Sequence, residues 1–210
     1  MTRFLKLSRQ LCIAILAMTL TGAPMAGDIP GLTAKTLSNG LEVIVIENPA
    51  VPLVTVEIAV HAGAFVEPPE LDGLSHLYEH MFFKGNKAIP TQEGFLEGMR
   101  ELGAEFNGTT SQELVNYYFT LPSTRLREGT IFMRDALLTP LFRRDELERE
   151  RPVVLGEFDR AEANPNFHLL REVDRVLWGE NFSRKNVIGD RAVLATATRD
   201  QMMLFREHYY

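Results

Sequence analysis

Two histidines and a glutamate near the middle of the chain have the spacing of a metal site. His76 and His80 stand four residues apart, and Glu79 directly precedes the second histidine. On a helix, residues four apart lie on the same face, one turn above the other. Two imidazoles so placed can bind one zinc ion, and the neighbouring carboxylate can take a proton from a water molecule that zinc activates. The pattern His-x-x-Glu-His therefore predicts metal-assisted hydrolysis.

The alternative is an amphipathic helix that carries two histidines and binds no metal. Apolar residues surround the motif and predict that its helix is buried: Leu74, Leu77, Met81, Phe82 and Phe83. Buried polar side chains need partners, because an unpaired one costs free energy. A shared metal ion explains two imidazoles and a carboxylate on a buried helix better than coincidence does.

The first 26 residues have the features of a secretory signal peptide. Arg3, Lys6 and Arg9 form a basic start, an apolar run follows at residues 11–20, and small residues predominate at residues 21–26. The run is short for a membrane span, which needs about 20 apolar residues, so an uncleaved anchor is the lesser alternative. We expect a signal peptide at residues 1–26, a single domain at residues 27–210, and a periplasmic or secreted product without a stable membrane span.

Charge and cysteine content narrow the classes of partner and ligand. The net charge is -6, and the predicted leader holds basic residues but no acid, so the remainder is more acidic still. An acidic domain argues against a nucleic-acid partner, which needs a basic face. The single cysteine, Cys12, lies within the leader. The rest of the chain forms no disulfide, and a metal site there must use histidine and carboxylate ligands.

The elements that must position the motif alternate between strands and helices. Asn39-Gly40 predicts a type I′ hairpin turn between two strands, because both residues tolerate the positive φ that this turn requires. The expected strands cover residues 32–37, 41–47, 52–62, 106–110 and 114–121, and the expected helices cover residues 73–84, 91–102, 123–138, 166–178 and 198–210, with a loop at residues 63–72.

A second segment, residues 143–163, is charged and helical in pattern. Glu150 and Glu157 are seven residues apart, so they share a face if the helix is continuous. Pro152 complicates this, because proline removes a backbone donor and can kink a helix or begin a new one. For Glu146 and Glu148 we expect an ordinary solvated face.

Taken together, these residues resemble the pitrilysin/insulysin family of zinc metallopeptidases, which includes the mitochondrial processing peptidases. Residues 73–85, GLSHLYEHMFFKG, are similar to the zinc helix of that family almost residue for residue. The resemblance implies zinc ligands at His76, His80 and Glu157, with Glu79 as general base. It also implies a site-adjacent role for Glu150, which orients a ligand or tunes the local charge.

The resemblance extends to residues 107–111, Asn-Gly-Thr-Thr-Ser, which are similar to the strand that pairs with substrate backbone in that family. It implies substrate contacts at Asn107, Gly108 and Thr109. Gly108 stands where the family usually has alanine, and we expect it to loosen the edge. The alternative is that Asn107 is an ordinary turn or strand-end residue.

The implied fold is α+β, a mostly antiparallel sheet packed with helices, like a half-unit of the pitrilysin type that stops before its last strands. The implied function is zinc-dependent hydrolysis of peptides or small unfolded proteins, with a second, related domain or subunit closing the substrate chamber. A partner-dependent or non-catalytic half-subunit that binds zinc and peptide is the alternative. A purely structural zinc site is less favoured, because such sites usually have four protein ligands.

Overall fold

The computed structural model describes residues 29–179 and 186–210, so the signal peptide expected at residues 1–26 lies outside the described residues. The chain divides into two compact units, the first ending at Val51 and the second running from Pro52 to Tyr210. The described part of the first unit is a hairpin. The second unit contains the histidine motif and all the helices of the described ranges.

The hairpin of the first unit pairs β1 (Leu32–Thr36) with β2 (Glu42–Ile46) in antiparallel register. Its turn differs from the type I′ turn that the sequence predicts. The amide of Gly40 donates to the carbonyl of Leu37 (2.9 Å), and Gly40 is the only turn residue with positive φ, at +88°. A three-residue connection that ends on a left-handed glycine needs one such position instead of two, so Asn39 keeps negative φ.

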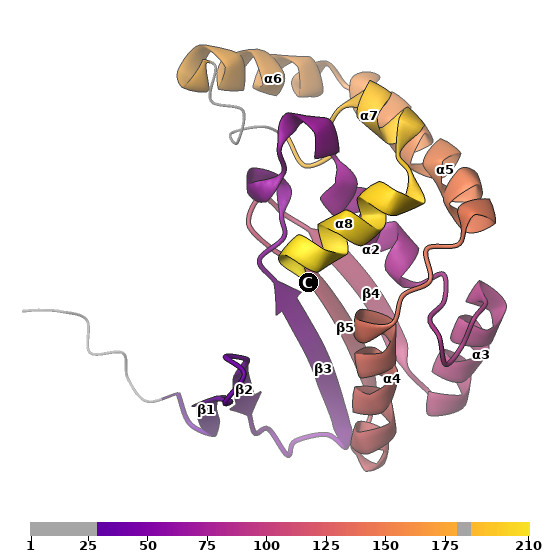
Figure 1. Ribbon diagram of the computed structural model, residues 1–210. Helices are drawn as coiled ribbons and strands as arrows, with labels where there is room; N and C mark the ends of the chain where they lie inside the picture. Colours follow the sequence, from indigo (N-terminus) through magenta and orange to yellow (C-terminus); the bar gives the residue numbers. More distant parts are fainter. Residues whose placement is uncertain (1–28, 180–185) are drawn as a thin grey trace, which may run out of the picture. The chain divides into compact units, whose positions relative to one another are not determined.

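The second unit contains a three-stranded antiparallel sheet with the order β3-β5-β4 (Figure 1). The strands are β3 (Leu53–Val60), β4 (Glu105–Thr110) and β5 (Val115–Pro122). The register pairs Val60 with Val115 on one side of β5 and Thr110 with Val115 on the other. Within the described residues, β4 is therefore an edge strand with a single neighbour.

One face of this sheet is covered by helices, as the alternation of its side chains requires. In β5, the odd-numbered residues from Val115 to Leu121 are buried and the even-numbered ones are partly exposed. The covering helices are α2 (Leu74–Phe82), α3 (Gln92–Leu102) and α4 (Leu126–Leu138), and α8 (Arg199–Tyr209) packs against α2. The motif helix α2 packs its apolar side on the sheet, with the ring of Phe82 stacked on that of Tyr117. The prediction of an antiparallel α+β fold is confirmed.

The charged segment forms a single helix, α5 (Arg144–Glu162), despite Pro152. The carbonyl that Pro152 leaves without a helical donor belongs to Glu148, which is exposed, so water can satisfy it. Glu148 is solvated as expected. The same expectation is wrong for Glu146, which is buried because it lies one turn before Glu150 on the face that packs inward.

Within the described ranges, three helices follow α5. The first and last, α6 (Pro165–Trp178) and α8, correspond to the predicted helices. Between them, α7 (Arg191–Thr196) was not predicted. It is only six residues long, and the side chain of Asp190 caps it by accepting from the amides of Ala192 and Val193. None of the helices in the described ranges has the length and apolar composition to cross a membrane.

The start of α2 is fixed by a carboxylate from the preceding connection. That connection, expected as a plain loop, contains two short 3-10 turns at Ala64–Val66 and Pro69–Leu71. Between them, buried Glu67 accepts hydrogen bonds from the amides of Gly73 (3.0 Å) and Ser75 (2.6 Å). These amides lie at the start of the helix, where no preceding helical turn supplies a carbonyl to accept their hydrogen bonds. Glu67 therefore holds the end of α2 that leads into His76.

We predict that Glu67→Ala lowers the free energy of unfolding by about 2 kcal/mol, because it leaves two amides of a buried helix start without this acceptor. Urea denaturation of the purified chain measures the effect. Glu70→Ala, three residues away and exposed, is the matched control, and we expect little change from it. Equal stability of the Glu67→Ala and Glu70→Ala variants would contradict the capping role.

Candidate metal and catalytic site

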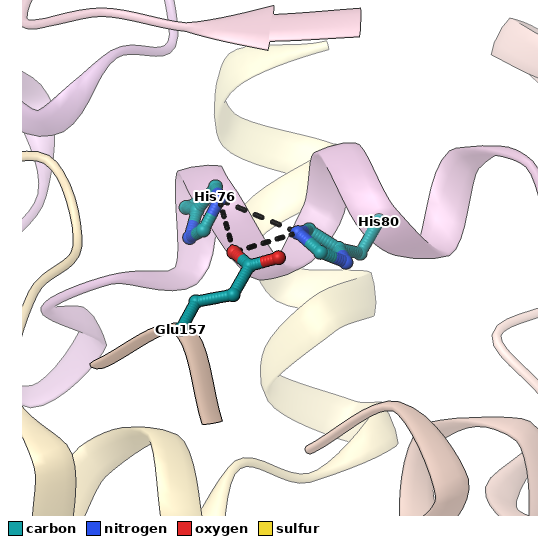
Figure 2. Close-up of side chains that lie close together, drawn as sticks. All are labelled: His76, His80 and Glu157. Atoms are coloured by element: carbon teal, nitrogen blue, oxygen red, sulfur yellow. Dashed lines mark hydrogen bonds and ion pairs between the residues drawn. The ribbon is translucent and has the colours of Figure 1, made fainter. Parts of the chain in front are cut away.

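The motif residues lie where α2 faces α5. His76 and His80 occupy successive turns of α2, as their spacing predicts, and Glu157 reaches toward them from α5. Figure 2 shows both imidazole rings turned toward the Glu157 carboxylate. The two histidine side chains are 17% exposed and that of Glu157 is 30% exposed. The group is thus mostly buried yet open on one side.

The distances within this group match the spacing of metal ligands. The Nε2 atoms of His76 and His80 are 3.3 Å apart, and each lies 3.5 Å from Oε2 of Glu157. Ligands at about 2.1 Å from a tetrahedral zinc ion are separated by about 3.4 Å. Two imidazoles and one carboxylate also form a known donor set for zinc sites that keep an open fourth position. The residues present therefore fit a zinc ion.

His80 is oriented by a second carboxylate on α5. Its Nδ1 lies 2.8 Å from Oε1 of Glu150, and Oε2 of Glu150 lies 2.6 Å from the ammonium of Lys84. A neutral His80 that donates its Nδ1 proton to Glu150 has a free lone pair on Nε2, the atom facing Glu157. For His76, by contrast, the buried Nδ1 has no hydrogen-bond partner among the described residues.

In the metal-free protein, the surroundings shift the pKa values of the two histidines in opposite directions. Burial, helped by the charge of nearby His80, lowers the pKa of His76 to about 4, so its ring is neutral at physiological pH. Burial also acts to lower the pKa of His80, but the hydrogen bond to Glu150 and the charge of Glu157 outweigh it and raise that pKa. The hydrogen bonds from His80 and Lys84 overcome burial and lower the pKa of Glu150.

Glu79 lies on the same helix and turns toward strand β4. Burial raises the pKa of its carboxyl group, while the hydrogen bond from Thr110 acts in the opposite direction. The hydroxyl of Thr110 donates to Oε2 of Glu79 at 2.5 Å. A partly buried carboxylate with a raised pKa, next to a metal-ligand set, is suited to accept and release a proton.

The three residues proposed for substrate contact lie on edge strand β4, which alternates between two environments. Asn107 and Thr109 are exposed, whereas Gly108 is buried against α2. A Cβ atom at position 108 would come within 2.8 Å of Cγ of Glu79 and 3.3 Å of the Phe83 ring. The glycine thus allows β4 to approach Glu79 closely. Its observed contribution is this close packing, and the expected loosening of the edge stays a prediction.

Sequence reasoning did not identify two residues that contact the proposed site, Lys84 and Thr110. Lys84 stands one helical spacing beyond His80, and this repeat of four is the only hint of its position. Thr110 contacts Glu79 because β4 packs on α2, and no local pattern indicates that contact.

We predict that Gly108→Val lowers the free energy of unfolding by about 1–3 kcal/mol, because the new side chain must displace Glu79 or β4. Thr109→Val is the matched control, since it places the same side chain on the exposed face of the same strand. Guanidinium denaturation of both variants provides the comparison. A Gly108→Val protein as stable as Thr109→Val would mean that β4 does not approach α2 this closely.

Comparison with known proteins places this chain in a family. The family model described as Insulinase (Peptidase family M16) matches residues 42–191. An uncharacterized zinc protease of Bacillus subtilis, YmxG, is 27% identical over 175 residues, which cover 83% of this chain and 42% of that protein. The chain therefore spans less than half the length of this curated relative.

Solved structures show the same fold. The periplasmic protease PqqL from Escherichia coli superposes with a TM-score of 0.77 at 23% identity, over 87% of this chain and 21% of PqqL. A peptidase M16 inactive domain from Pseudomonas fluorescens superposes with a TM-score of 0.74 at 19% identity, over 83% of this chain and 42% of that chain. The family match covers most of the described chain and includes His76, Glu79, His80 and Glu157, and the chain belongs to the insulinase family of peptidases, M16.

Proposed function

We propose that this protein is a zinc-dependent endopeptidase that hydrolyses peptides or small unfolded proteins. The observation that carries the proposal is the convergence of His76, His80 and Glu157 from two helices, with all three ligand atoms within 4.8 Å of one another. Membership of a peptidase family and the similarity to proteins named zinc proteases support it.

In this proposal, His76, His80 and Glu157 hold zinc, and a fourth position remains for water or substrate. Bound zinc supplies a Lewis acid that makes water acidic at neutral pH and polarises the scissile carbonyl. Glu150 is not a ligand in this proposal. It forms a hydrogen bond with Nδ1 of His80 and so fixes the direction in which Nε2 points.

Glu79 is the proposed general base. Its carboxylate accepts a proton from the attacking water and delivers it to the leaving amine as the peptide bond breaks. The hydrogen bond from Thr110 holds Oε2 of Glu79 in place. The raised pKa of Glu79 favours this exchange, since a base whose pKa lies nearer to the working pH gives the proton back more readily.

Strand β4 is the proposed docking edge for substrate. An extended peptide can add to an edge strand through main-chain hydrogen bonds, which read little of the substrate sequence. We propose that residues 107–109 make these contacts, since Gly108 packs directly against Glu79 and brings the edge close to the base. The substrate class is therefore an extended or unfolded polypeptide.

A second candidate function is a half-subunit that binds zinc and peptide but needs a further domain or chain for turnover. One observation supports it: the Pseudomonas fluorescens structure with this fold is described as an inactive domain. We also propose a periplasmic or secreted location, supported by the signal-like residues 1–26 and by the similarity in fold to PqqL, a periplasmic protease.

We predict that the purified chain binds about one zinc ion, and that Glu157→Ala weakens binding by more than about 100-fold. Loss of one of three ligands should exceed the 10–100-fold effect of outer-shell changes. Zinc content after dialysis and competition with a chromophoric chelator measure both quantities. Glu148→Ala, exposed on the same helix, is the control and should bind like the parent. A folded parent chain that binds no zinc would overturn the proposed site.

We predict that Glu79→Gln retains zinc but loses about 100-fold or more of its peptide hydrolysis, because the amide cannot accept the proton. Cleavage of an unstructured peptide that carries a fluorophore and a quencher measures the rate. Equal rates for Glu79→Gln and parent would exclude Glu79 as the base.

The same assay separates the two candidate functions. A parent chain that binds zinc and cleaves the peptide alone supports the self-sufficient enzyme. A zinc-loaded parent that cleaves only after a second M16 domain is added supports the half-subunit.

A further inference from the structure

Two charged side chains, Glu150 and Lys84, form a line of contacts that begins at Nδ1 of His80. Lys84 follows the C-terminal end of α2, and its ammonium lies 2.6 Å from Oε2 of Glu150. The other Glu150 oxygen, Oε1, lies 2.8 Å from Nδ1 of His80. Each oxygen of Glu150 is thus engaged by a different partner, one on each side of the carboxylate.

This line lies in a poorly solvated part of the molecule. The side chains of Lys84 and Glu150 are only 14% and 10% exposed. Two opposite charges at this depth hold each other strongly, and removal of one partner leaves the other buried and uncompensated. Without Lys84, the Glu150 carboxylate would lose the partner on its Oε2 side and could turn toward water, which weakens its hold on His80.

The position of Lys84 also selects between two buried carboxylates. Glu146 lies one turn before Glu150 on α5 and is buried as well, but its Oε2 has no hydrogen-bond partner among the described residues. The ion pair that Lys84 makes is with Glu150, the carboxylate that contacts His80.

We propose that Lys84 is a positioning residue for the metal site. It acts through Glu150, by holding that carboxylate in the orientation that keeps Nδ1 of His80 engaged and turns Nε2 toward Glu157 and His76. The inference rests on the proposed function, since it assigns Lys84 a role toward the metal that His80 would bind. An alternative is that Lys84 only fastens α2 to α5, with no specific effect on His80.

A double-mutant cycle on the full chain distinguishes these roles, with the zinc dissociation constant from chelator competition as its readout. If Lys84 acts through Glu150, Lys84→Met weakens zinc binding by about 10–100-fold, as outer-shell changes do. The double variant Lys84→Met/Glu150→Gln then binds zinc about as weakly as Glu150→Gln alone, because the two residues form one path. Independent effects would multiply in the double variant.

Conservative variants and a matched control complete the test. Lys84→Arg keeps the charge and should restore most of the affinity, whereas Lys84→Gln keeps a donor but not the charge and should not. Exposed Lys87 gives the control: Lys87→Met should change the affinity by no more than about twofold. Unfolding in EDTA reports the stability of each metal-free variant. If Lys84→Met does not fold, the comparison of Lys84→Arg with Lys84→Gln decides.

Two results would overturn the inference alone: a parent that binds zinc while Lys84→Met and Lys84→Gln bind it equally well, or effects of Lys84→Met and Glu150→Gln that multiply. A parent that binds no zinc would remove the proposed function itself, and the role of Lys84 with it. These failures are distinguished by the parent measurement.

Discussion

The cost of burying polar groups on α2 is the constraint on which the rest of the structure depends. This helix buries Leu77, Tyr78 and Phe82 in the core, with Phe82 stacked on Tyr117 of the sheet, yet it also carries two imidazoles and a carboxylate. Buried polar groups without partners are expensive. Each neighbouring element supplies one: Glu67 to the helix start, Thr110 to Glu79, and Glu150 to His80. These contacts satisfy only part of the helix, because Nδ1 of His76 has no hydrogen-bond partner among the described residues.

The chemical groups are divided between two contacts of that helix. On one side, α5 brings Glu150 and Glu157 against the histidines. On the other side, β4 brings Gly108 and Thr110 against Glu79. The proposed metal ligands and the proposed base therefore have separate supports. Because Gly108 has no side chain, the base and the exposed edge of the sheet can approach each other closely.

Local patterns in the sequence predicted the parts of the site that lie on one element. The spacing of His76, Glu79 and His80 indicated both the helix and its chemistry, and Asn39-Gly40 indicated a hairpin between two strands. Glu157 required the resemblance to a family, because local patterns do not show which distant segments meet. The burial of Glu146 and the contacts of Glu67 and Thr110 depend on tertiary packing, and no periodicity indicates them.

The differences in detail have similar causes. Asn39-Gly40 marked a hairpin correctly, but the turn type depends on loop length, and Gly40 alone takes positive φ. Pro152 suggested a break in the charged segment, and the tertiary contacts of α5 outweigh that local preference. Helix α7 is too short to show a periodic pattern and is defined by its cap at Asp190.

The division of the donor atoms between α2 and α5 links metal supply to folding. A chain in which α5 has separated from α2 keeps two donors of the proposed set and loses the third, so it binds zinc less well than the folded unit. By mass action, a ligand held only by the folded form adds about 2.7 kcal/mol to its stability when the free ligand exceeds its dissociation constant a hundredfold. Zinc held at this site would therefore act as a reversible cross-link between α2 and α5. The concentration of free zinc around the protein would then set how strongly the contact between these two helices is stabilised.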